Sequence, residues 1–243
     1  MTNFQIQIIS DTICPVSPPN PSTNQLTPAQ WCYVGYRRLS RAITTHQALN
    51  PADTFSLHWK AFYLNPAGAA YPGVNKAEMY SQKFGAGRTE AIFARLAAVG
   101  EGDGIKFSFG GNSGSTRDSH RLLWYAGQKE GSQSQSGSGL VGGLQTRVAE
   151  QLFRAYFEDE KNITDLKVLV EAGVGGGLDR EEVKKVLNED VGAEEVDLEA
   201  KTAASRLVSG VPYITVQGKY HVEGADEPEA FLEIFEKIKA DEK

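Results

Sequence analysis

The sequence has few cysteines, no basic excess and no long apolar run. Only two of its 243 residues are cysteines, Cys14 and Cys32, too few for a secreted disulfide framework. Asp and Glu number 31 against 25 Lys and Arg, whereas nucleic-acid-binding proteins usually carry a basic face. No apolar stretch approaches the ~20 residues that cross a bilayer, and the N-terminal segment lacks the pattern of a secretory signal. We therefore expect a cytoplasmic protein without nucleic-acid or membrane partners.

Patterns for metal and nucleotide binding are also missing. No histidine lies close in sequence to another His or Cys, which argues against a zinc site. There is no P-loop and no glycine fingerprint after a strand, so we interpret the glycine-rich runs 100–104 and 173–177 as loops. The acidic run 187–199 is expected to form a solvated face or helix ends. We expect no metal; Lys76 and Arg88 are candidates for contacts with an anion. The histidines are His46, His58, His120 and His221.

Two kinds of periodicity divide the chain. Hydrophobic residues make up 40% of it, enough for a real core. Alternating apolar residues predict strands, and a spacing of three to four predicts helices. The strand signals lie at both ends of the chain, so we expect an α/β protein in which residues 1–60 and 203–243 form one domain and residues 61–202 a helical insertion. The expected strands are 4–10, 54–60, 213–216 and 219–222; the expected helices are 32–49, 76–84, 88–99, 118–130, 145–158, 163–172, 179–189 and 228–239.

Residues 16–30 do not fit this organisation. The segment VSPPNPSTNQLTPAQ contains four prolines and no apolar periodicity. It lies between a strand end and a helix start, where connections usually span about 2–6 residues, so it is predicted to be an irregular surface loop. Without it, Cys14-Pro15 would join Trp31-Cys32 and give Cys-Pro-Trp-Cys at the start of the first helix.

The rejoined motif resembles the active site of DsbA-like thioredoxin-fold oxidoreductases, in particular their FrnE-type branch. That branch is related to kappa-class glutathione transferases and 2-hydroxychromene-2-carboxylate isomerases. Other segments resemble the family in the same order: SHRL at 119–122 and LFRAYF at 152–157 in its helical insertion, SGVPYITV at 209–216 in its cis-proline strand, and PEAF at 228–231 in its last helix. The resemblance implies a thioredoxin fold with a large helical insertion.

The resemblance also implies a redox-active site. A thiolate attacks a disulfide, and a helix N-terminus stabilises such an anion. By analogy, the protein would be a protein disulfide oxidoreductase acting on a thiol or disulfide of a protein or small molecule, as a monomer or homodimer. No cofactor is implied beyond glutathione as a co-substrate. The implied roles are nucleophile for Cys14, resolving thiol for Cys32, and substrate binding for Pro15, Trp31, Val211 and Pro212, with Pro212 in the cis form.

The inserted segment changes the spacing of this motif. Seventeen residues separate Cys14 from Cys32 in place of the family's two, so we expect the insert to impair activity. Two alternatives to the oxidoreductase stay open. One is a glutathione-dependent transferase or isomerase of the kappa-class type, and the other is a non-catalytic binding or chaperone module of the same fold.

The origin of residues 16–30 is also open. Val16-Ser17 can be encoded as GTA-AGT, a common intron donor, and Gln30 as CAG, a common acceptor. Leu26-Thr27 can contain a common branch-site sequence. The segment is therefore either a genuine loop or a short in-frame intron that is translated.

Overall fold

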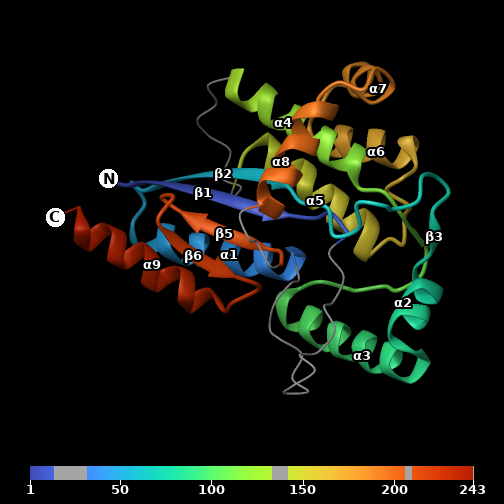
Figure 1. Cartoon of the computed structure of the whole chain (residues 1–243). Helices are drawn as coiled ribbons and strands as arrows, with labels where there is room; N and C mark the ends of the chain where they lie inside the picture. The colour runs from blue at the N-terminus through green and yellow to red at the C-terminus, as the bar shows by residue number, and fades with distance from the viewer. Residues whose placement is uncertain (14–31, 133–141, 206–209, 243) are drawn as a thin grey trace.

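The computed structural model describes residues 1–13, 32–132, 142–205 and 210–242. Its main sheet has the strand order β2-β1-β5-β6 (Figure 1). β1 pairs parallel with β2 and antiparallel with β5, and β5 pairs antiparallel with β6. The two ends of the chain therefore share one sheet, as predicted. The strands are β1 (Asn3–Ser10), β2 (Thr54–Ala61), β5 (Tyr213–Val216) and β6 (Tyr220–Glu223).

The central strand, β1, forms because its side chains alternate in character. Phe4, Ile6 and Ile8 are fully buried, whereas Gln5 is exposed and Gln7 half-buried. Successive side chains of a strand point to opposite faces, so this alternation buries one apolar face of the sheet. That face is the one on which the first helix packs.

The helices lie on two sides of this sheet. In Figure 1, α1 and α9 lie side by side, while α4, α5 and α8 gather on the side of β2. A small separate sheet pairs β3 (Val74–Asn75) with β4 (Asn112–Ser113). The helices are α1 (Cys32–Leu49), α2 (Lys76–Phe84), α3 (Ala86–Asp103), α4 (Arg117–Ser132), α5 (Leu144–Phe157), α6 (Leu166–Gly176), α7 (Arg180–Asn188), α8 (Ala193–Ser205) and α9 (Pro228–Asp241).

Arginines of α1 hold the C-terminal end of α3. Arg38 Nε lies 3.0 Å from Asp103 Oδ2, and an Arg41 guanidinium nitrogen lies 2.6 Å from Oδ1 of the same carboxylate. Arg37 Nε donates to the Asp103 carbonyl at 3.3 Å. The last carbonyls of a helix carry partial negative charge, which cations stabilise. The α2–α3 hairpin is therefore fixed beside α1.

The outer edge of β2 is covered by side chains of α5 and α8. The Gln145 amide accepts a hydrogen bond from Trp59 N at 2.9 Å and donates one to Trp59 O at 3.2 Å. Glu199 Oε2 accepts from Ala61 N at 3.2 Å. An open strand edge would otherwise expose unpaired backbone groups. These side chains therefore close the sheet on this side.

The largest hydrophobic cluster runs from the sheet into the helices. It includes Ile8 and Leu57 of the sheet together with Leu122, Leu152 and Val183 of the helices. The predicted domain boundaries near residues 60 and 203 stay a prediction.

The interpretation of the two glycine-rich runs as loops was wrong. Residues 100–103 form the last turn of α3, and residues 173–176 the last turn of α6. A Cβ at Gly100 would lie 2.4 Å from a ring atom of Phe107, so this helical glycine lets the Phe107 ring pack directly against α3. Only Gly104 and Gly177, with φ of 71° and 108°, leave the helical conformation as left-handed caps.

Helix α8 and the strands β3 and β4 were not predicted. The acidic run 187–199 spans the end of α7 and the start of α8, and its acidic side chains are largely exposed. This agrees with the expectation of helix ends or a solvated face. A tight turn joins β5 and β6. Gln217 and Gly218 both have positive φ, 53° and 64°, and Lys219 N donates to Val216 O at 3.1 Å, as in a type I′ turn.

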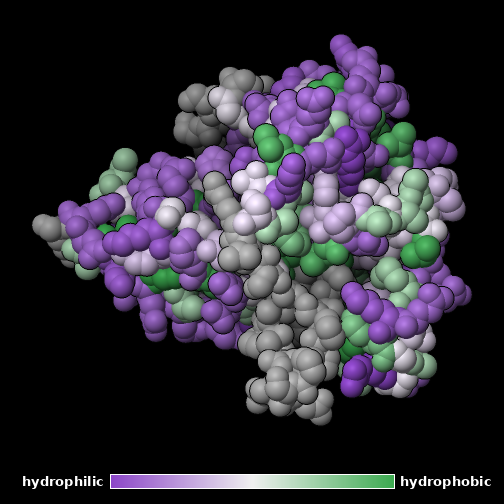
Figure 2. Space-filling view, viewed as in Figure 1, coloured by the Kyte–Doolittle hydropathy of each residue, from purple (hydrophilic) through white to green (hydrophobic). Residues whose placement is uncertain are grey.

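The surface seen in Figure 2 is largely hydrophilic, with small scattered hydrophobic areas. Large exposed apolar side chains occur singly along the described chain, for example Leu49, Leu166 and Leu198. Among the helices of the described residues, none combines the length and the apolar character needed to span a membrane.

Candidate active site

Cys32 is the first residue of α1. Its side chain is buried, with 1% of the residue exposed, and the first turn of the helix contains no acidic residue. The first backbone N–H groups of a helix have no partner within the helix and favour an anion. The described site therefore combines a buried thiol with a helix end suited to negative charge.

The loop before β5 packs against the same turn of α1. Val211 and Pro212 are buried, and the bond between them is cis, as expected from the family resemblance. A Cβ at Gly35 would lie 2.9 Å from Pro212 Cγ and 3.5 Å from Ala225 Cα. The glycine at this position therefore lets the loop approach the turn that begins with Cys32.

A buried polar cluster follows the end of β1. Asp11 Oδ2 accepts from Leu64 N at 2.8 Å, and Asp11 Oδ1 lies 3.4 Å from His120 Nε2. The hydroxyls of Thr12 and Ser119 are 2.7 Å apart. All four of these polar side chains, on Asp11, Thr12, Ser119 and His120, are buried. Paired polar groups are stable when buried, so the cluster fixes residues 11 and 12 against the start of α4.

Two tyrosines connect α1 to the segment that contains α5. The Tyr33 hydroxyl donates to Glu158 Oε1 at 2.8 Å, and the Tyr36 hydroxyl donates to Glu150 Oε1 at 2.5 Å. Burial, reinforced by these carboxylates, raises the pKa of both phenols well above the usual value. Both hydroxyls therefore stay protonated at neutral pH and act as hydrogen-bond donors that position α1.

The structure brings together some of the predicted site residues. Val211 and Pro212 lie beside the α1 turn that begins with Cys32. Cys14, Pro15 and Trp31 lie outside the described residues, so their predicted roles and the distance between the two cysteines remain predictions.

Sequence analysis missed the contact of His120 with Asp11 and did not place Lys76 in a pocket. His120 was expected to be a structural histidine, and its pairing with Asp11 was not foreseen because 109 positions separate them. The signal in the sequence was SHRL at 119–122, which resembled a family segment without indicating a contact. Lys76, proposed only as an anion contact, is buried at the start of α2.

The chain matches a known protein family. The family model of the DSBA-like thioredoxin domain matches residues 29–236. No curated protein is significantly similar in sequence to the chain.

Several solved structures share the fold. A probable DsbA oxidoreductase from Streptomyces coelicolor is 27% identical, with a TM-score of 0.74 over 95% of this chain and 88% of its own. The cytosolic disulfide reductase DsbM from Pseudomonas aeruginosa, solved with GSH, is 14% identical, with a TM-score of 0.55 over 97% and 99%. A 2-hydroxychromene-2-carboxylate isomerase is 14% identical, with a TM-score of 0.56 over 98% and 99%. The last two likenesses concern the fold alone.

Proposed function

Because the chain belongs to the DSBA-like thioredoxin domain family, we propose that it is a thiol–disulfide oxidoreductase. The observation that carries the proposal is Cys32 at the N-terminus of α1, beside the loop of Val211 and Pro212. The similarity to a probable DsbA oxidoreductase supports the same reaction type. In the proposal the protein is cytoplasmic, since two cysteines suit a redox pair in a reducing compartment.

The proposed reaction uses the two cysteines in sequence. The Cys14 thiolate attacks a substrate disulfide, forms a mixed disulfide and releases one substrate thiolate. The Cys32 thiolate then attacks the Cys14 sulfur and releases the second substrate thiolate. The substrate gains two electrons, and the enzyme is left with a Cys14–Cys32 disulfide. The reverse sequence oxidises a substrate dithiol.

The burial of Cys32 supports its role as the resolving thiol. With 1% of the residue exposed, Cys32 is poorly placed to attack a bulky substrate first. A resolving thiol has to reach only the sulfur of its partner. In the proposal, Val211 and Pro212 contact the substrate beside this sulfur, and Pro15 and Trp31 contribute from the segment outside the described residues. Glutathione is the proposed co-substrate that reduces the enzyme disulfide.

The proposal is tested by insulin reduction with dithiothreitol as the reductant. We expect the wild-type chain to accelerate the reaction, and Cys14→Ser to abolish the acceleration. In Cys32→Ser, a mixed disulfide with glutathione should accumulate at Cys14, where mass spectrometry can locate it. Equal rates in the wild-type protein and both variants would contradict the proposal.

The same preparation separates the two alternatives. Glutathione conjugation to 1-chloro-2,4-dinitrobenzene without insulin reduction would instead support a transferase of the kappa-class type. Neither activity, together with suppression of the aggregation of an unfolded test protein, would support a non-catalytic chaperone module.

A further inference from the structure

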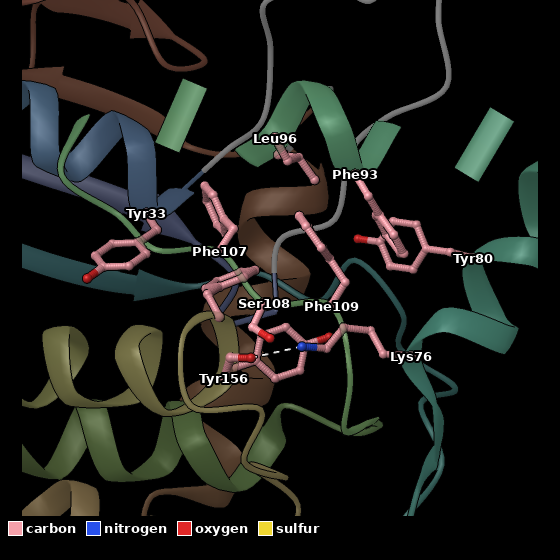
Figure 3. A pocket seen from close by; sticks show the side chains of 10 residues that line it. Tyr33, Lys76, Tyr80, Phe93, Leu96, Phe107, Ser108, Phe109 and Tyr156 are labelled. Atoms are coloured by element: carbon pink, nitrogen blue, oxygen red, sulfur yellow. Dashed lines mark hydrogen bonds between the residues drawn. The ribbon is translucent and has the colours of Figure 1, made fainter. Parts of the chain in front are cut away.

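An aromatic pocket lies between α1, the α2–α3 hairpin and α5 (Figure 3). Seven of its ten lining residues are Phe or Tyr. Phe93 of α3 and Phe109 stack nearly parallel, with centroids 4.2 Å apart and an interplanar angle of 8°. Phe107 lies close to parallel with Phe109 at 6.4 Å. The rings therefore present flat surfaces of similar orientation, which favour another planar ring.

These aromatic side chains are incompletely covered. Phe93, Phe107 and Phe109 are half-buried, and they pack around a small cluster of Tyr80, Ile92 and Leu96 that is separate from the main core. When an apolar ligand covers a half-buried aromatic surface, apolar area is removed from water, which favours binding. The pocket thus has the aromatic lining of a ligand site. Its open space is about 20 Å³, so a ring enters only when the half-buried side chains move apart.

One cation reaches this pocket. Lys76 is only 4% exposed, and Figure 3 shows its side chain extending toward Ser108 and Tyr156. Lys76 Nζ donates to Tyr156 O at 2.8 Å and lies 4.0 Å from the centroid of the Tyr156 ring. An ammonium has three donors, and the described residues supply Lys76 with one oxygen acceptor.

The nearby acid is engaged elsewhere. Glu160 acts on Lys76 through space, but its carboxylate accepts hydrogen bonds from Gly110 N and from the Ser108 hydroxyl. Burial lowers the pKa of Lys76 to about 8. A buried ammonium is stable when an anion pairs with it, and the neutral Tyr156 carbonyl and ring are partners of lower charge.

We propose that this pocket binds an aromatic carboxylate, with the ring against Phe93, Phe107 and Phe109 and a carboxylate oxygen on Lys76 Nζ. A monoanion is favoured because Lys76 is the single cation among the described lining residues. Tyr33, which follows Cys32, also lines the pocket, so the ligand lies close to the start of α1. The binding does not depend on the proposed thiol chemistry.

The test is isothermal titration calorimetry at pH 7 with two probes, 2-naphthoate and the neutral 2-naphthylmethanol. The wild-type chain should bind the carboxylate about tenfold more tightly than the alcohol. Lys76→Met should weaken binding of the carboxylate about tenfold and leave binding of the alcohol unchanged. Lys83→Met is the matched control, because Lys83 is exposed on the same helix, and it should bind both probes like wild type.

Three results would overturn the proposal. These are no binding of 2-naphthoate, equal affinity of the wild-type chain for both probes, or full binding of 2-naphthoate by a folded Lys76→Met. The comparison of probes on the wild-type chain decides the question even if the variant does not fold. A chain with both cysteines changed to serine should retain the binding, which separates failure of this proposal from failure of the oxidoreductase proposal.

Discussion

Gly35 is the residue at which the first helix and the loop before β5 come closest. The position is helical and needs no unusual backbone angle, so only the lack of a side chain explains the glycine. Its neighbours there are the Pro212 ring and the backbone of Gly224 and Ala225. A single methyl group at this point would push apart two segments that both belong to the proposed active site.

Gly35→Ala should therefore lower both stability and thiol chemistry. We expect the free energy of unfolding in urea to fall by roughly 1–3 kcal/mol, as for other overpacked positions, and the rate of insulin reduction to fall with it. Gly87→Ala is the matched control, since a Cβ at this helical glycine meets nothing within 4 Å. Its stability should stay equal or rise by up to about 1 kcal/mol. If the Gly35→Ala protein were as stable as wild type, the loop before β5 would have moved to accommodate the methyl group without lowering the free energy of unfolding.

A second prediction for a single residue concerns Lys76 and the pH dependence of stability. Its folded pKa is about 8, whereas an unfolded lysine has a pKa near 10.4. Between these values the unfolded chain holds the proton more tightly, so this group makes stability rise as pH increases from 8 toward 10.4. Below pH 8 the cost of burying the charge is constant.

Replacing Lys76 with Met should remove that cost. At pH 7 the variant should be more stable than wild type by about 1–3 kcal/mol, and the difference should vanish by about pH 11. Urea unfolding of both proteins at each pH gives the difference directly, because the tyrosines that titrate at high pH are common to both. A difference that is the same at pH 7 and 11 would mean that the Lys76 charge is not penalised by burial.

At the scale of elements, Gln145 replaces a neighbouring strand. It satisfies the backbone N–H and C=O of Trp59 and also donates to Leu123 O at 3.1 Å. One α5 side chain thus connects the edge of β2 to α4.

Gln145→Leu should lower the free energy of unfolding by about 2–4 kcal/mol, since it leaves several buried backbone groups without partners. It should also promote self-association, because the edge of β2 loses its cover. Gln128→Leu, at an exposed position of α4, should change stability by less than about 0.5 kcal/mol. Urea unfolding and sedimentation velocity measure the two effects. Equal stabilities of the two variants would argue against a role for the Gln145 amide in holding this edge.

Elements with strong local patterns could be predicted from sequence, and those defined by tertiary contacts could not. The predicted spans of α1 and β5 agree with the structure because their apolar spacing and flanking residues are local. α8 was not predicted, because its buried face has weak hydrophobic character. The face consists of Ala193, Val196, Ala200 and Ala203, which lie among acidic residues. The two-residue strands β3 and β4 exist only through their pairing with each other.

The same limit applies to the candidate site. The position of Cys32 at the start of α1 and the cis bond before Pro212 could be predicted, because the family resemblance rests on short motifs. The roles of both residues in the reaction stay predictions. The Asp11–His120 pair and the pocket around Lys76 join residues far apart in the chain, which no local pattern reveals.

At the scale of the whole molecule, residues 16–30 interrupt an otherwise family-like chain. The family match begins at residue 29, after nearly all of this segment. Genomic sequence and transcript reads across codons 16–30 would decide its origin. Codons that differ from GTA-AGT at the start or CAG at the end would rule out the intron.

Deleting residues 16–30 should restore Cys-Pro-Trp-Cys and activate the site. With the insert present, we expect the pKa of the Cys14 thiol to stay near the ordinary value of ~8.5. In the shortened chain it should fall by about one unit or more, because stabilisation by the helix N-terminus is confined to the first turn. The pH dependence of alkylation at Cys14, followed by mass spectrometry in a Cys32→Ser background, gives both values. Equal pKa values, or equal insulin-reduction rates of the two chains with both cysteines present, would contradict the prediction.

The strand order also sets a delay during synthesis. β1 emerges from the ribosome first, yet one of its two edges pairs with β5, where Ile6 faces Val216. At about 5–20 residues per second, that edge stays without its partner for on the order of 10–40 s. A nascent chain that stops before residue 213 carries a central apolar strand with an unpaired edge, which is a substrate for chaperones and a template for aggregation. Soluble yield should therefore depend on completing the C-terminal hairpin more than on any residue of the active site.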